Sequence, residues 1–147
     1  MEWDREIRQN LGNPFFLARK AMQHMIIKGA GGKIIFTASI LSYQGGLFVP
    51  SYTASKGGIA QLTKALSNEL ADKGINVNSI APGYVVTDIT SALRQDKNRS
   101  ADLMARIPMK RWGTIDDMAG AAVYLASDAS SYVNGELINV DGGWMGR

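Results

Sequence analysis

Three short apolar runs, separated by long stretches of helical character, constrain the fold of this chain more than any other feature. The runs cover residues 33–38, 75–81 and 136–140, and the first is β-branched and aromatic enough for a strand buried on both faces. Helix and strand patterns therefore alternate along the chain, which predicts an α/β fold. Right-handed crossovers between successive strands would make the sheet parallel.

Local signals mark where the helices begin and end. The first helical stretch extends through residue 26 and stops at the glycines that start with Gly29. The second covers residues 51–73, with Gly74 in the position of a C-cap. The third begins after Thr114, the expected N-cap, and its expected apolar face includes Met118, Ala121, Ala122, Tyr124 and Leu125. Between residues 84 and 113 the pattern is weaker, with short helical pieces near 91 and 101–106, and we expect one domain over residues 1–147.

The composition excludes several classes of function. The chain has no cysteine and one histidine, His24, so we expect no disulfide, no thiolate catalysis and no metal site. A formal net charge of +3, spread along 147 residues, does not predict nucleic-acid binding. No apolar run approaches the ~18 residues of a membrane span, and the first residues lack the pattern of a signal peptide. The sequence therefore predicts a cytoplasmic protein that binds neither nucleic acid nor membrane.

A tyrosine and a lysine, Tyr52 and Lys56, stand four residues apart near the start of the second helix, so both side chains lie on one face. A free tyrosine has a pKa of about 10, and a nearby ammonium favours the phenolate. We therefore expect Lys56 to lower the pKa of Tyr52. Ser39 follows the first strand, and in a parallel sheet that end meets the start of the next helix at the ligand crevice. A hydroxyl there could hold a carbonyl oxygen while Tyr52 transfers a proton.

Two further segments contain residue types that suit a site. Asn10 and Gly12 both weaken a helical turn, so a local kink there would free a backbone carbonyl for water. An exposed asparagine without a role would give the same pattern. The segment from Pro82 to Thr87 follows the second strand, where Gly83 permits close backbone approach and the next peptide groups could pair with a flat carboxamide. A simple turn is the alternative.

In order along the chain, these motifs resemble those of the short-chain dehydrogenase/reductase family over essentially the whole sequence. The resemblance rests on Asn10 in Gln-Asn-Leu-Gly, Ser39, the run from Tyr52 to Lys56, Asn76-Val-Asn78, Pro82-Gly83 with Thr87, and Val140-Asp-Gly-Gly143. It implies four catalytic residues: Ser39 to polarise a carbonyl, Tyr52 as general acid/base, Lys56 on the nicotinamide ribose, and Asn10 to hold a water in the proton relay. It also implies a set of cofactor contacts: Tyr52, Lys56, Pro82, Gly83, Val85 and Thr87.

The resemblance implies that the chain is the C-terminal part of a Rossmann-type doubly wound parallel sheet, with about three strands, flanking helices and the N-terminal βα units absent. The glycine-rich turn that seats a dinucleotide pyrophosphate on a helix N-terminus in this family is not in the sequence. The glycines from Gly29 to Gly32 follow a helix and precede a strand, which is the wrong order for that turn. We therefore expect a truncated chain with little or no turnover alone. The expected cofactor is NAD, with NADP as the alternative.

Finer resemblance, in residues 44–52 and in Asp141-Gly142-Gly143-Trp144, is to the family members that act on sugar acids of the 2-dehydro-3-deoxy-D-gluconate or gluconate type. A substrate carboxylate suits a guanidinium, for which Arg94, Arg99 and Arg106 are candidates, although solvated helix charges would look the same. A 3-oxoacyl-carrier-protein reductase is an alternative, and so is a non-catalytic fragment that only associates with related subunits. The resemblance also implies a homo-oligomer, either a tetramer or a dimer.

Overall fold

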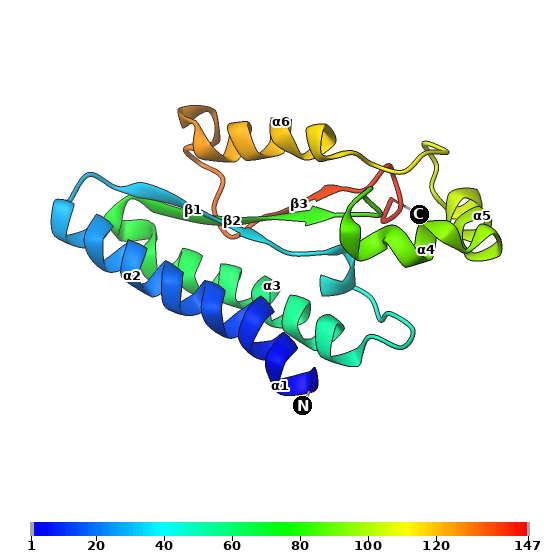
Figure 1. Ribbon diagram of the computed structural model, residues 1–147. Coiled ribbons are helices and arrows are strands. Elements are labelled where there is room, and N and C mark those ends of the chain that lie inside the picture. Colours follow the sequence, from blue (N-terminus) through cyan, green and yellow to red (C-terminus); the bar gives the residue numbers. More distant parts are fainter. Residues whose placement is uncertain (1, 147) are drawn as a thin grey trace.

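A three-stranded parallel sheet forms the centre of the computed structural model, which describes residues 2–146 (Figure 1). The strands are β1 (Gly32–Thr37), β2 (Ile75–Pro82) and β3 (Leu137–Val140), in the order β1-β2-β3. Gly32 pairs with Ile75 and Ser79 pairs with Leu137, both in parallel register. The predicted parallel α/β arrangement is confirmed.

Helices cover both faces of the sheet, as a doubly wound fold requires (Figure 1). One face carries α1 (Glu2–Ile7), the π-helical turn η1 (Arg8–Gly12), α2 (Asn13–Lys28), α3 (Pro50–Leu70) and η3 (Ala71–Lys73). The other face carries α6 (Ile115–Ala126), which is followed by η5 (Asp128–Ser130). The segments after β1 and β2 contain η2 (Ile40–Ser42), η4 (Asp88–Thr90), α4 (Ser91–Gln95) and α5 (Lys97–Arg106). Within residues 2–146, no helix is both long enough and apolar enough to cross a membrane.

The helix ends form where the sequence predicts them. Gly29 and Gly74 adopt φ values of 66° and 68° at the ends of α2 and η3, a left-handed conformation that a residue with a Cβ adopts only at a cost. At the start of α6, Asp117 N–H donates to Thr114 Oγ1, and Thr114 N–H donates to the Asp117 carboxylate. This reciprocal pair satisfies two backbone groups that the helix itself leaves without partners.

The main core lies between the sheet and the α2–α3 layer. The central strand β2 is buried along most of its length, as expected for a strand covered on both faces. The expectation that β1 is also buried on both faces is wrong. Ile34 and Phe36 are buried against the α2–α3 layer, but Ile35 is half-buried and Thr37 is exposed. The reason is that β1 is an edge strand of this sheet.

One residue of α6 departs from the predicted apolar face. Leu125 is fully buried, whereas Tyr124 is 39% exposed. The positions that turn inward follow the helical period of three and four residues, at 118, 121, 122 and 125. Tyr124 lies outside that stripe, so its assignment to the buried face is corrected.

Candidate active site

Ser39 is fixed directly after β1 by a reciprocal pair of hydrogen bonds. Its backbone is extended, and its N–H donates to Ser42 Oγ at 3.2 Å. Its own Oγ accepts from Leu41 N–H at 3.1 Å. This capping box starts η2 and holds the Ser39 hydroxyl in one position within a residue that is 7% exposed.

Tyr52 and Lys56 lie on the first turns of α3, which begins at Pro50. The Lys56 ammonium donates to Thr37 O at 2.7 Å, and its Nζ lies 5.6 Å from the centroid of the Tyr52 ring. Ser42 Oγ donates to Lys56 O at 2.7 Å. The lysine is therefore held through both its side chain and its main chain. The end of β1 and the start of α3 meet here, as the parallel sheet predicts.

The electrostatics of the phenol differ from the prediction. The Ser39 hydroxyl hydrogen-bonds to Tyr52 and lowers the pKa of that phenol, but burial has a larger effect and raises it. The Glu6 carboxylate raises it further. Burial also lowers the pKa of Lys56, since its ammonium loses water. The expectation that Lys56 brings the pKa of Tyr52 below its usual value is wrong, because burial of the phenol has the largest effect on that pKa and raises it.

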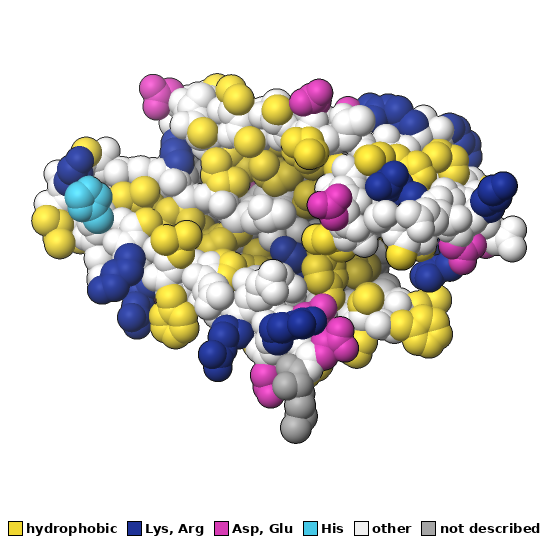
Figure 2. Space-filling model, viewed as in Figure 1, with side chains coloured by type: hydrophobic (Ala, Val, Ile, Leu, Met, Phe, Trp, Pro, Cys, Tyr) yellow, Lys and Arg dark blue, Asp and Glu magenta, His cyan; other side chains and the backbone are white. Residues whose placement is uncertain are grey.

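Asn10 lies in η1, where the Asn13 N–H donates to Arg8 O five residues earlier. The predicted distortion of the first helix is therefore confirmed, in the form of a π turn. Asn10 is half-buried and lines, with Lys56 and Thr37, a groove of about 680 Å³ between α2 and β1. Figure 2 shows hydrophobic side chains along the hollow between the α6 layer and α2. Asn10 and Lys56 thus border one cavity.

Pro14 supplies a physical reason for this π turn. It stands in the first turn of α2 and has no N–H, so it cannot donate to Asn10 O four residues earlier. The series of helical backbone hydrogen bonds is therefore interrupted at the Asn10 carbonyl. Pro14 thus adds to the weakening of this turn by Asn10 and Gly12.

The segment after β2 is held close to the end of β3. A Cβ on Gly83 would lie 2.7 Å from the Cα of Asp141, so the backbone there leaves room for glycine only. Thr90 Oγ1 donates to Val85 O at 2.7 Å, and Thr87 N–H donates to Thr90 Oγ1 at 3.1 Å. The carbonyl of Val85 and the amide of Thr87 are therefore used within the segment itself.

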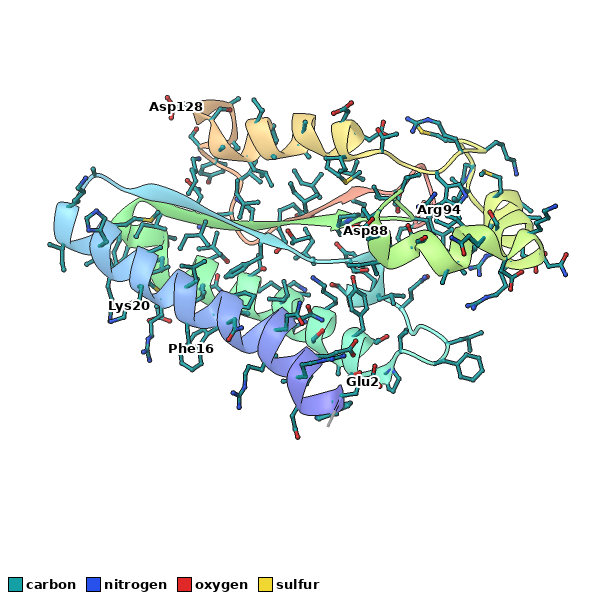
Figure 3. All side chains as sticks on the ribbon, viewed as in Figure 1. Glu2, Phe16, Lys20, Asp88, Arg94 and Asp128 are labelled. Carbon is teal, nitrogen blue, oxygen red and sulfur yellow. The ribbon has the colours of Figure 1, made fainter. Side chains whose placement is uncertain are left out.

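The three arginines considered for a substrate carboxylate have different surroundings. Arg94, on α4, donates from Nη2 to Thr87 O at 3.3 Å, and Figure 3 shows it near the carboxyl ends of the strands. Arg99 is exposed on α5. Arg106 is also exposed, and its guanidinium carbon lies 4.1 Å from the centroid of the buried Trp144 ring. Arg94 is thus joined to the segment after β2, and Arg106 to the C-terminal turn.

Some residues that shape the site were not predicted. Ser42 binds both Ser39 and Lys56, and the Ser-x-x-Ser spacing from Ser39 is a capping-box pattern that could have identified it. Glu6 accepts a hydrogen bond from Ser51 Oγ, beside Tyr52. That contact joins residues 45 positions apart in the sequence, so no local sequence pattern predicts it.

Comparison with known proteins decides the family. The family model described as Enoyl-(Acyl carrier protein) reductase matches residues 1–145. A 2-dehydro-3-deoxy-D-gluconate 5-dehydrogenase of Pseudoalteromonas atlantica is 59% identical over 145 residues, which are 99% of this chain and 57% of that protein. The chain belongs to the short-chain dehydrogenase/reductase family.

Other short-chain dehydrogenases/reductases agree in sequence and in structure. A 2-dehydro-3-deoxy-D-gluconate 5-dehydrogenase of Escherichia coli strain K12 is 52% identical over 146 residues, covering 99% of this chain and 58% of the relative. The crystal structure of a gluconate 5-dehydrogenase from Burkholderia cenocepacia J2315, in complex with NADP and tartrate, matches with a TM-score of 0.97 at 40% identity. The match covers 99% of this chain and 57% of that one. The predicted Rossmann-type fold is confirmed, and the chain spans little more than half the length of these relatives.

Proposed function

We propose that this chain carries the proton-transfer side of the active site of a NAD(P)-dependent oxidoreductase that interconverts a secondary alcohol and a ketone. One observation carries the proposal: the Lys56 ammonium lies 5.6 Å from the centroid of the Tyr52 ring and donates to Thr37 O at the carboxyl end of β1, where the Ser39 hydroxyl interacts with the phenol and lowers its pKa. A half-buried acid beside a hydroxyl donor suits proton transfer to a carbonyl oxygen.

The roles of these groups follow from their chemistry. In the direction of reduction, the Tyr52 phenol donates its proton to the carbonyl oxygen as the carbonyl carbon accepts a hydride. Ser39 Oγ donates a hydrogen bond to the same oxygen and orients it. In the direction of oxidation, the phenolate accepts the hydroxyl proton as a hydride leaves the carbon. Because burial raises the pKa of Tyr52, the phenol is protonated at neutral pH, and a higher pH favours oxidation.

The donor set fits a nicotinamide cofactor, which supplies or accepts the hydride when bound. The Lys56 ammonium has three protons, and its contact with Thr37 O uses one, so it can also donate to ribose hydroxyls. We assign Pro82, Gly83, Val85 and Thr87 to the nicotinamide side, with the Val85 amide and the Thr87 hydroxyl as partners for the carboxamide. We assign Asn10 to a water in the proton relay. The Burkholderia cenocepacia relative was solved with NADP, so either NADP or the expected NAD is the cofactor.

The proposed substrate is a sugar acid. The relatives from Pseudoalteromonas atlantica and Escherichia coli are named for 2-dehydro-3-deoxy-D-gluconate, and the Burkholderia cenocepacia relative is named for gluconate. A panel of sugar acids and 3-oxoacyl thioesters separates this substrate from that of a 3-oxoacyl-carrier-protein reductase. Activity on neither would favour the non-catalytic alternative.

We further propose that the protein is a homo-oligomer, as a dimer or a tetramer. Phe16 and Leu17 on α2 are 54% and 74% exposed, which is apolar surface that a second subunit would cover. Light scattering on the purified protein tests this, and a monomer at all concentrations would contradict it.

The decisive experiment uses a longer protein, because this chain spans 57% of the Pseudoalteromonas atlantica relative. The preceding residues of that relative are joined to this chain, and Tyr52→Phe is compared with the unaltered fusion. Turnover should fall by about 10²–10⁴-fold, the usual contribution of a general acid, while cofactor binding measured by fluorescence persists. Tyr124→Phe, at a tyrosine 39% exposed on α6, is the control and should be unchanged. Full activity of Tyr52→Phe would overturn the assignment.

A further inference from the structure

The first turn of α3 receives a contact from a different helix. Ser51, which is 9% exposed and precedes Tyr52, donates from Oγ to Glu6 Oε2 on α1. Glu6 is half-buried, and α1 packs against α3. A buried hydroxyl bound to a carboxylate forms a charge-assisted hydrogen bond, which is stronger than one between neutral groups.

This contact reaches a helix start that has no side-chain cap of its own. Val49 occupies the N-cap position of α3 and makes no capping hydrogen bond from its side chain, and Pro50 follows it. The N-terminus of a helix carries partial positive charge and is stabilised by a nearby anion. Glu6 brings a carboxylate to that end from outside the helix, so it can take over part of the work that a serine or aspartate cap performs.

We propose that Glu6 is a positioning residue for Tyr52, which holds the first turn of α3 in place through its hydrogen bond from Ser51. The inference rests on the proposed function, since it matters for turnover only if Tyr52 transfers the proton. Glu6 acts through Ser51 and the helix start and contacts no reacting atom.

The Glu6 carboxylate also affects the pKa of the Tyr52 phenol. The charged side chains that the described residues place against Tyr52 are Lys56 on α3 and Glu6 on α1, and Ser39 from the segment after β1 adds a neutral hydrogen bond. The carboxylate raises the pKa of Tyr52 because a second negative charge nearby disfavours the phenolate. Removal of that charge should therefore lower the pKa of Tyr52, whereas a purely structural role would leave it unchanged.

The test compares Glu6→Gln with Ser51→Ala, first in the 147-residue chain. Phenolate absorbance is followed against pH, and the same titration of Tyr52→Phe is subtracted to isolate Tyr52 from the other tyrosines. Glu6→Gln should titrate at lower pH than the unaltered chain. Hydrogen exchange of the amides in the first turn of α3 should quicken by about tenfold in Ser51→Ala, the factor expected from loss of one hydrogen bond to a charged group. It should quicken less in Glu6→Gln, whose amide oxygen still accepts from Ser51 Oγ without the charge.

Glu2→Gln is the matched control, because it removes the same charge from the same helix at a side chain that is 80% exposed. It should change neither the titration nor the exchange. If Glu6→Gln does not fold, Ser51→Ala still removes the hydrogen bond to Glu6 with the loss of one oxygen, and unchanged exchange in that variant would overturn the proposal. A Tyr52 titration that is identical in Glu6→Gln and the unaltered chain would also overturn it.

The same variants in the longer fusion protein separate this inference from the proposed function. If both hold, the pH profile of kcat for Glu6→Gln moves toward lower pH, and kcat changes more than KM. If Glu6→Gln shifts the titration of Tyr52 in the 147-residue chain but the unaltered fusion protein is inactive, the role of Glu6 is supported and the oxidoreductase function is refuted. An active fusion in which Glu6→Gln changes neither the titration of Tyr52 nor the pH profile of kcat would support the oxidoreductase and refute the role of Glu6.

Discussion

Two regions border the carboxyl ends of the strands, and they are held in different ways. One is the corner, which we define as Thr37, Ser39, Ser42, Tyr52 and Lys56. The other is the cover, residues 84–113. In the corner, hydrogen bonds run between separate elements, and Ser39 and Lys56 are buried. In the cover, most side chains of α4 and α5 are exposed, and the hydrogen bonds of Arg94, Gln95 and Asp96 stay within the segment.

The two regions therefore differ in how rigidly their side chains are held. Groups that transfer a proton need fixed distances, and cross-element hydrogen bonds in a buried setting provide them. The cover is joined to other elements at its end, where Met109 N–H donates to Gly142 O and Arg111 pairs with Asp117, whereas α4 and α5 rest mainly on local bonds. Substitutions in the corner and in the cover should therefore differ in the size of their effects.

Replacement of Lys56 by methionine should have the largest effect. It removes the ammonium at nearly constant length, so turnover of the longer fusion protein should fall by about 10²–10⁴-fold and cofactor binding should weaken. The unfolding free energy of the chain at neutral pH should change little, because burial of the ammonium itself costs stability. Lys64→Met, on the exposed side of α3, is the control for both assays. An active Lys56→Met fusion would show that the corner does not perform the chemistry.

The same pair of proteins gives a dependence on pH. Burial places the pKa of Lys56 in the folded chain below its usual 10.5, so the unfolded chain binds more protons between those two values. Stability conferred by this group therefore rises with pH across that interval, and the cost of the buried charge is fully present below it. In urea unfolding at several pH values, the unfolding free energy of the unaltered chain should rise relative to that of Lys56→Met as the pH approaches 10.5. A difference that stays constant would mean that the ammonium is not buried.

Gly83→Ala tests the border between the two regions. The added Cβ would lie 2.7 Å from the Cα of Asp141, so main chain must move, and we expect a loss of about 1–3 kcal/mol in the unfolding free energy. Gly120→Ala in α6 is the control, since a Cβ there meets nothing within 4 Å and should gain up to about 1 kcal/mol of helix propensity. Urea midpoints that move in the same direction for both variants would contradict this account.

Ser42→Ala against Ser91→Ala compares one hydroxyl from each region. Ser42 Oγ joins Ser39 N–H to Lys56 O, so its loss should cost about 0.5–2 kcal/mol, as for other caps. Ser91 Oγ accepts an exposed hydrogen bond from Gln95 Nε2 at 3.3 Å, and its loss should stay within about 0.5 kcal/mol. Both values come from urea unfolding. Equal losses would remove the distinction between the regions.

Ser42 also illustrates what the sequence can and cannot predict. Periodicity predicts the strands and helices, and capping chemistry predicts the ends at Gly29, Gly74 and Thr114, because these are local effects. The meeting of Ser39 with Tyr52 follows from one further rule, that parallel strands end at one edge. The proximity of the candidate site residues could therefore be predicted from the sequence alone.

The electrostatics and burial of these residues could not be predicted from the sequence. The direction of the pKa shift of Tyr52 depends on how much water the phenol loses, and burial depends on all the packed elements together. The Glu6–Ser51 contact depends on how α1 packs against α3, which is a long-range feature of the fold. The one-sided burial of β1 likewise depends on what lies beside it in space. None of these has a local pattern.

The smallest expected effect comes from the attachment of the cover to the C-terminal turn. Arg106 lies with its guanidinium carbon 4.1 Å from the centroid of the Trp144 ring, and Trp144 in turn packs edge-on against Tyr84. Because Arg106 is exposed, Arg106→Ala should cost about 0.5–1 kcal/mol in urea unfolding, whereas Lys97→Ala, also exposed on α5, should cost less. The loss should persist in high salt if the ring contact dominates, since surface ion pairs weaken as ions screen them. A loss as large as that of Gly83→Ala would mean that the cover is fixed as firmly as the corner, and the contrast between the two regions would then be lost.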